Sequence, residues 1–333
     1  MRPRCAHQRP QRQLVQPLQT LQLLQLRRVR RQRQSAFSLT ETMLSVSLCM
    51  PLVLGATHLL CQSAAEQVLS HQRLLMDQNT HFALHVIAKV VELAGHQDPL
   101  STATRRAVPR LRGWDDATLA ARTDIANGKS GSGPSGSDVL IVHFMSSATA
   151  TASALNCAGM PVPLTGASAV NSTAPEEGYS VFYVARGPDG ENELRCKYRT
   201  ATGWDSEALV QGVESFQVLY GLDRDGDGQP DQFLRASAIS DEISHGVSAA
   251  SLWNRVVALK IALLMVGAQR LQQTRAPARW DLFGEDYSAL HAQDDRGTML
   301  TVDHFSIQRR HRLRRSYEQL IFLRNPALAA ALT

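Results

Sequence analysis

The residues best suited to chemistry in this chain of 333 residues form one short acidic run. It consists of Asp223, Asp225, Asp227, Gln229 and Asp231, with two glycines among them. Carboxylates at alternate positions in a glycine-containing turn can fold their oxygens around one hard cation, and the Gln229 carbonyl can add a further ligand. The sequence therefore predicts a Ca²⁺ site. The twelfth position of an EF-hand loop is Leu234 here, so an acidic turn that binds no ion is the alternative.

Two of the five cysteines, Cys157 and Cys196, follow the apolar N-terminal part of the chain. In an oxidising compartment a disulfide between them would close a loop of roughly 40 residues and stabilise the fold by about 3–4 kcal/mol. Two buried free thiols are the alternative. No pair of cysteines has the spacing of a zinc or redox motif.

The other motifs that could support catalysis or metal binding are weak. A glycine-rich run at 131–136 precedes a strand instead of joining a strand to a helix, so it predicts a flexible loop. His81 and His85 have metal-capable spacing, but no acid completes a zinc motif, and we expect both to be exposed. Five arginines between 309 and 315 are interpreted as a solvated turn before the last strand. With no nucleophile elbow or paired catalytic carboxylates, we expect neither an enzyme nor a small-molecule substrate.

Charge is distributed unevenly along the chain. Residues 1–36 contain nine arginines and no acid, which leaves 26 basic and 30 acidic residues in the remainder. The remainder of the chain, called the body below, thus carries a net charge of about −4. Because the basicity lies on a segment that looks removable, nucleic-acid binding by the body is not expected.

The segment after the arginines, from Phe37 to Leu60, is apolar and long enough to span a bilayer. The preceding arginines would keep its N-terminal side in the cytoplasm. Glu41 interrupts the apolar run close to its start, and an acid inside a membrane segment is a functional hypothesis by default.

A basic leader, a small residue, and then Phe-Ser-Leu-Thr-Glu before an apolar helix resemble the class III signal of type IV prepilins. The resemblance implies that a prepilin peptidase cuts between Ala36 and Phe37 and that Phe37 becomes an N-methylated terminus. Glu41 would then be the fifth residue of the mature chain, where it could pair with the terminal amine of a neighbouring subunit. An ordinary signal anchor with a stray acid is the alternative.

Periodicity predicts the elements that position these residues. Residues 64–94 keep a helical pattern, with Gly95 placed as a C-terminal cap, so that one helix over 37–94 would reach roughly 85 Å. Two separate helices over the same residues would give the same sequence pattern. Strands are expected at 138–145, 179–186, 192–199, 215–221, 255–264 and 317–325, with loops at 127–137, 146–154 and 267–300. The predicted fold class is α+β, with a long transmembrane helix packed on one antiparallel sheet.

Several stretches also resemble the PilW-type minor pilins, over most of residues 35–328. They lie at 82–84, 93–95, 136–140, 194–196, 209–214, 217–221, 256–260, 313–315 and 323–325. The resemblance implies a minor pilin that helps to prime or cap pilus assembly, with other minor and major pilins as partners.

The expected organisation is a leader at 1–36, a transmembrane helix at 37–62, its continuation at 63–96 and a β-rich head at 97–333. The protein would cross the inner membrane once, with its head in the periplasm, before it joins a pilus on the cell surface. A minor pseudopilin of a type II secretion system is the alternative of the same kind. A membrane-anchored calcium-binding adhesin or extracytoplasmic enzyme is the alternative of another kind.

Overall fold

The computed structural model describes residues 38–96, 109–127, 129–146, 154–162, 176–244, 249–270 and 279–325. The chain divides into two compact units, Met1–Ser63 and Ala64–Thr333. Helix α1 (Leu39–Glu92) belongs to the first unit at its start and to the second unit at its end.

In the first unit, α1 is apolar and its described residues are exposed, with Leu39, Val46 and Leu52 more than half exposed. The helix is long and apolar enough to cross a membrane by its length and composition. It begins at the Ser38 carbonyl, which accepts the backbone N–H groups of Glu41 and Thr42 at 2.9 and 3.1 Å. The prediction of one continuous helix is therefore confirmed.

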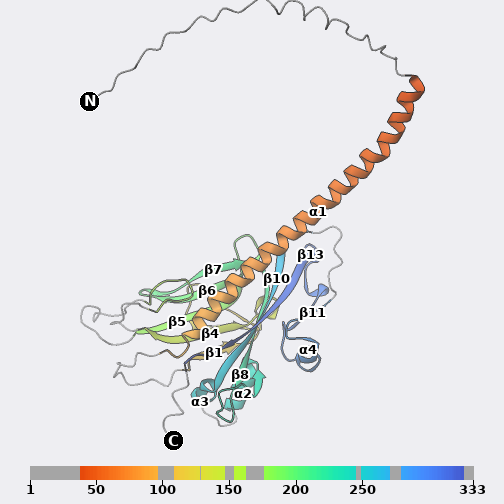
Figure 1. The fold of residues 1–333 in the computed structure, drawn as a ribbon. Coiled ribbons are helices and arrows are strands. Elements are labelled where there is room, and N and C mark those ends of the chain that lie inside the picture. Colours follow the sequence, from red (N-terminus) through yellow and green to blue (C-terminus); the bar gives the residue numbers. More distant parts are fainter. Residues whose placement is uncertain are drawn as a thin grey trace, which may run out of the picture. The chain divides into compact units, whose positions relative to one another are not determined.

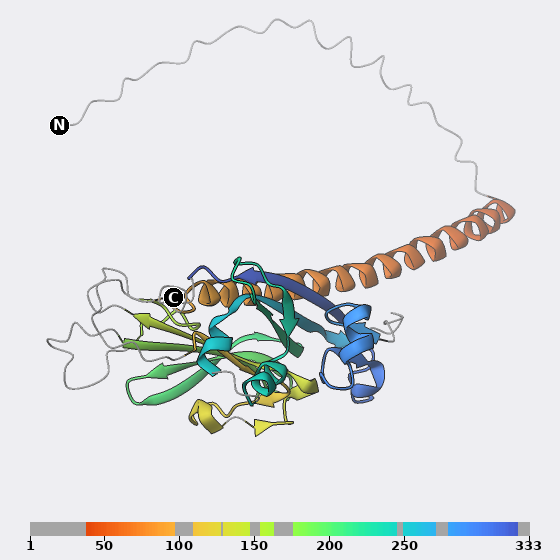
Figure 2. The same ribbon diagram turned by 90° about the horizontal axis from the view of Figure 1, so that it is seen from below.

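The second unit contains two large antiparallel sheets, beside the two-stranded pairs β2-β3 and β11-β12 (Figures 1 and 2). The first has the order β1-β4-β5-β6-β7 and consists of β1 (Leu111–Trp114), β4 (Val139–Ser146), β5 (Glu176–Arg186), β6 (Asn192–Thr200) and β7 (Gly203–Gln211). The second has the order β13-β10-β8-β9 and consists of β8 (Val213–Leu222), β9 (Gln232–Leu234), β10 (Val256–Arg270) and β13 (Arg312–Phe322). The α+β fold class is confirmed, but the head has two main sheets where the sequence predicted one.

The end of α1 supplies the helical part of the main core. One face of the helix, including Ala83, Ile87 and Val91, is completely buried among residues of both sheets, such as Phe182 and Ile261. These helix residues follow the three-to-four spacing of a helix with one buried face. The core therefore joins the helix and the two sheets into one unit.

Helix α1 and strand β13 lie side by side (Figures 1 and 2). Arg315 of β13 forms an ion pair with Asp77 of α1 at 3.1 Å, and the Tyr317 hydroxyl donates to the same carboxylate.

Gly95 ends the helical segment in the left-handed conformation, with φ of +68°, as its cap position predicted. Its N–H donates to the carbonyl of His143 in β4 at 3.0 Å.

The stretch 267–300 was predicted as a loop, but its described residues 279–300 form most of a second layer. Residues 267–270 are the end of strand β10, and the layer consists of strand β11 (Arg279–Asp281), helix α4 (Glu285–His291) and strand β12 (Met299–Thr301). Trp280, Leu282 and Leu300 of this layer pack on Leu264 of the four-stranded sheet. Elements of three to seven residues carry too little periodic pattern to be recognised, and packing on the sheet stabilises them.

The remaining elements are short. They are α2 (Ala236–Ser244), α3 (Ala249–Asn254), the strand pair β2 (Ala117–Thr118) and β3 (Lys129–Ser130), and the 3-10 turns η1 (Ile125–Asn127), η2 (Pro134–Gly136) and η3 (Val302–His304). Ala117 packs with Val139, Val181 and Tyr183 on the outer face of the five-stranded sheet. This small outer core is separate from the main core.

Candidate functional site

Glu41 lies in the first turn of α1 and is exposed. Its apolar neighbours are exposed as well, with relative exposures of 76% for Leu39 and 67% for Met43. Within the described residues, no basic group lies at ion-pair distance from its carboxylate. The predicted cleavage site at Ala36 and Phe37 lies outside the described residues. The structure thus presents an exposed carboxylate on an apolar helical surface.

The predicted calcium loop connects β8 to β9. Carboxylate oxygens of Asp223, Asp225 and Asp227 all lie within 4.8 Å of one another, close enough to share one cation. The Asp231 carboxylate is not in this group and accepts the backbone N–H of Arg224 at 2.7 Å. The structure therefore brings together three of the four predicted carboxylates.

Backbone N–H groups hold the three carboxylates in place. Asp223 accepts the N–H groups of Gly226 and Gly228 at 2.6 and 2.9 Å, while Asp227 accepts that of Gln229 at 2.7 Å. Partial burial acts to raise the pKa of Asp223, but the N–H groups of Gly228 and Gly226 outweigh it and lower the pKa below its usual value. The loop is thus shaped by its own backbone, with Gly226 and Gly228 at positive φ.

Cys157 and Cys196 form a disulfide with their Cα atoms 5.8 Å apart, the pair that the sequence predicted. Both are buried, and the bridge ties the turn at 154–162 to β6. Because 39 positions separate them, the link restricts the unfolded chain strongly.

We expect a Cys157→Ala/Cys196→Ala double variant to lose about 3–4 kcal/mol of unfolding free energy. Urea titration followed by tryptophan fluorescence would measure it. A reducing agent should destabilise the wild type by a similar amount and leave the double variant unchanged. A reducing agent without effect on the wild type would show that the bridge does not form.

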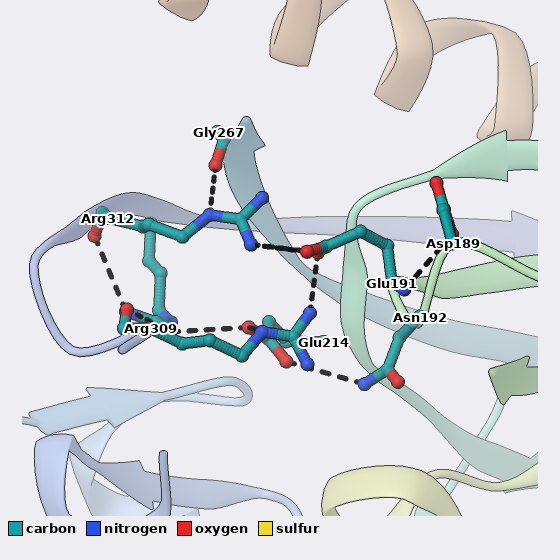
Figure 3. A network of polar contacts seen from close by, with 8 residues as sticks. Asp189, Glu191, Asn192, Glu214, Gly267, Arg309 and Arg312 are labelled. Atoms are coloured by element: carbon teal, nitrogen blue, oxygen red, sulfur yellow. Dashed lines mark hydrogen bonds and ion pairs between the residues drawn. The ribbon is translucent and has the colours of Figure 1, made fainter. Parts of the chain in front are cut away.

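The arginine run at 309–315 begins in a turn that leads into β13, as the sequence predicted, but the run is not solvated throughout. Arg312 and Arg314 are buried, at 7% and 4% exposure. Figure 3 shows Arg309 and Arg312 converging on Glu191, with distances of 2.7 and 2.8 Å. Arg312 also donates to the Gly267 carbonyl at 2.6 Å. Nothing in the local sequence marks these arginines as buried, since their acidic partners lie about 100 positions away or more.

Glu214 forms the inner part of the same network. Its carboxylate accepts hydrogen bonds from the Arg314 guanidinium at 3.2 Å and from the Asn192 side-chain amide at 3.4 Å. The Arg314 guanidinium lies 3.7 Å from the centre of the Phe305 ring. Burial lowers the pKa of Arg314, and Glu214 opposes that effect. The network fastens the turn between β5 and β6 to β8, β10 and the start of β13, and so joins the two sheets.

Glu191 gives this network a dependence on pH. Partial burial acts to raise the pKa of Glu191, but Arg312 and Arg309 outweigh it and lower the pKa below its usual 4.5. The stabilisation is therefore complete above that value and is lost as the pH falls through the lower, folded-state pKa. We expect Glu191→Gln to reduce the stability at pH 7 and to flatten its fall below about pH 4.5.

Urea titrations of the wild type and of Glu191→Gln from pH 7 to 3 would measure this difference. Asp189→Asn in the same turn is the matched control, because Asp189 is exposed and its side chain accepts the Glu191 N–H, which an asparagine side chain can also accept. Identical pH profiles for Glu191→Gln and the wild type would contradict the assignment.

A second link between the sheets surrounds Asp138. Its buried carboxylate accepts the N–H of Val218 in β8 at 2.8 Å, and its own N–H donates to the Phe216 carbonyl at 2.8 Å. Burial, with repulsion from Asp115, raises the pKa of Asp138 well above its usual value. The turn before Asp138 is not an open loop at its end, because Gly136 and Ser137 are buried.

His81 and His85 of α1 are exposed, as predicted.

These observations define the class of protein. It has one long helix, α1, which is apolar over a membrane-spanning length, and the C-terminal end of this helix packs into a head with two large antiparallel sheets. Residues 181–325 match the family model described as type IV pilus-assembly protein W. The match covers less than half of the chain, from within β5 to just past β13, and includes Glu191, Glu214 and the five arginines. The head is thus similar to that pilus-assembly family. No curated protein and no solved structure matches the chain.

Proposed function

We propose that this protein is a minor pilin that takes part in the assembly or priming of a type IV pilus at the filament tip. It acts by inserting its helix among other pilin helices and by contacts of its head, not by catalysis. The observation that carries the proposal is the exposed, apolar start of α1 with one carboxylate, Glu41, in its first turn. The similarity of the head to a pilus-assembly family supports it.

In this proposal Glu41 sets the axial position of the subunit. A prepilin peptidase creates a positively charged amine at Phe37, and that amine of one subunit pairs with Glu41 of its neighbour. Inside an apolar bundle an unpaired carboxylate is costly, at least about 2.5 kcal/mol. Pairing therefore favours the one axial register in which the Glu41 carboxylate meets the amine over the registers that leave this carboxylate unpaired.

The decisive experiment is the mass of the N-terminal peptide after co-expression with a prepilin peptidase. We expect a chain that starts at N-methylated Phe37. The inactive-peptidase control should leave the leader in place. A chain with an intact leader in the presence of active peptidase, or one cut elsewhere, would refute the pilin assignment.

A pseudopilin of a type II secretion system would share the leader and the acid, so the mass alone does not separate the two. The family match favours the pilus, because it lies in the head and is to a pilus-assembly family. Loss of pili, with normal secretion, on deletion of the chain is the expected result. The reverse would favour the pseudopilin.

We also propose that the loop of Asp223, Asp225 and Asp227 binds Ca²⁺ and stabilises the connection from β8 to β9. The three residues fit a calcium ion, since oxygens from all three lie within 4.8 Å of one another and Asp225 and Asp227 are exposed. The ion would supply charge neutralisation only. The β8–β9 connection then becomes the most ion-sensitive part of the head.

Ca²⁺ at 100 times its Kd should stabilise the protein by about 2.7 kcal/mol, which raises Tm by roughly 5–10 °C. Asp225→Ala should abolish the rise. Asp189→Ala, which removes an exposed aspartate from another turn, should keep it. If Ca²⁺ leaves the Tm of the wild type unchanged, the loop is an acidic turn without an ion.

A further inference from the structure

The proposed calcium loop, residues 223–231, contains one cation of its own, Arg224. The backbone N–H of Arg224 donates to the Asp231 carboxylate at 2.7 Å and so closes the loop. Its side chain points to other elements, because the guanidinium donates to Glu242 of α2 at 2.7 Å and to the Gln232 side chain of β9 at 3.4 Å. Arg224 therefore links the loop to the helix that follows it.

Helix α2 provides a fixed position for this contact. The Asp115 carboxylate accepts two backbone N–H groups at the start of the helix, at 2.9 and 2.8 Å. Ile239 of the helix is completely buried in the main core. Glu242 lies in the last turn, which contains no basic residue, and an acid there is unfavourable because of the helix dipole. Pairing with Arg224 offsets that effect, while the core and Asp115 hold the helix in place.

The position of the Arg224 guanidinium matters because it is a cation next to a cation site. The carboxylates of Asp223, Asp225 and Asp227 attract a guanidinium as they attract Ca²⁺. A guanidinium close to them would neutralise part of their charge and repel the metal ion. The ion pair with Glu242 holds this cation on an acid that does not belong to the group of three carboxylates.

We propose that Arg224 and Glu242 couple the calcium loop to α2, and that Glu242 raises the affinity of the loop for Ca²⁺ by holding the Arg224 guanidinium away from the three carboxylates. The inference rests on the calcium site proposed above. The coupling is reciprocal. Bound Ca²⁺ neutralises the carboxylates that compete with Glu242 for the guanidinium, so it strengthens the contact between the loop and α2.

A direct long-range attraction between Glu242 and the metal ion is the competing explanation. A carboxylate near a calcium site attracts the ion without any contact. That attraction would be the same whether or not residue 224 is arginine, because independent effects on binding are additive. If Glu242 acts through Arg224, its effect disappears once the arginine is removed. A double-mutant cycle of the two residues therefore separates the explanations.

The test measures the Kd for Ca²⁺ by isothermal titration calorimetry of the full chain in nanodiscs of zwitterionic lipid, with empty nanodiscs as the blank. We expect Glu242→Gln to weaken binding by about threefold, which is within the range of a surface ion pair. Arg224→Gln should bind at least as tightly as the wild type, and adding Glu242→Gln to it should have little further effect. Asp241→Asn removes the same charge one position earlier in α2 and should bind like the wild type.

The possible results separate the coupling from the calcium site itself. No Ca²⁺ binding by the wild type would remove both. Binding by the wild type with an unchanged Kd in Glu242→Gln would remove the coupling and leave the site. An equal loss of affinity in Asp241→Asn, or the same loss from Glu242→Gln when Arg224 is absent, would show that Glu242 acts through long-range attraction and would overturn the coupling. The Tm of each variant without Ca²⁺ verifies that the head is folded.

Discussion

A Glu41→Gln variant is expected to reach the membrane at the wild-type level and to enter filaments at least about tenfold less often. Glutamine keeps the shape of the side chain but removes its charge. The methylated amine of the neighbouring subunit would then lie in an apolar bundle without a counter-ion, and removing one partner of a buried pair costs about 3–5 kcal/mol. The ratio of the protein in sheared pili to that in membranes measures the effect.

Glu66→Gln is the matched control, because Glu66 lies on the same helix and is exposed. It lies outside the first unit of the chain and should enter filaments normally. Glu41→Ala should behave like Glu41→Gln, which separates the loss of charge from a change of shape. Filament entry of Glu41→Gln at the wild-type level would remove the register argument while leaving the cleavage prediction open.

Replacing Glu214 by leucine is expected to destabilise the head by about 3–5 kcal/mol, because the buried cation of Arg314 loses its counter-charge. The two side chains are only 1% and 0% exposed, and their charged atoms are 3.2 Å apart. All four tryptophans of the chain lie in the second unit, so urea titration by tryptophan fluorescence reports on the head alone.

The matched control is Glu318→Gln, which breaks the ion pair of Glu318 with Lys260 at 3.4 Å, where the glutamate side chain is 42% exposed. A surface pair contributes about 0–1 kcal/mol. The double variant Glu214→Leu/Arg314→Met should recover most of the loss, since no charge remains buried without a partner. A loss in Glu214→Leu no larger than that of the control would show that the network contributes little.

The sequence predicted the helix and most of the long strands, because their patterns are local. The alternation in 192–199 and the apolar run in 255–264 are properties of neighbouring residues, and the first lies within β6 while the second lies within β10 except for Arg255. The loop aspartates were recognisable for the same reason, since alternate carboxylates with glycines fold back on themselves. Their meeting within 4.8 Å depends on fewer than ten residues of chain.

The second sheet and the layer of β11, α4 and β12 were not predictable, because they depend on contacts between distant segments. The burial of Arg312 and Arg314 is the clearest case. A run of five arginines has the composition of a solvated turn, and the alternation along β13 that turns two of them inward becomes visible only when the strand begins at Arg312. Glu191 and Glu214, more than 90 positions earlier, then neutralise them.

The sequence by itself determined what short-range physics controls: an apolar segment of membrane length with one acid, a helix that continues beyond it, an acidic loop and the Cys157–Cys196 pair. Only the tertiary structure decided which charges are buried and which groups pair with them. Burial and pairing depend on packing between segments far apart in the chain. The arginine network at Glu191 and Glu214 is therefore a feature of the fold.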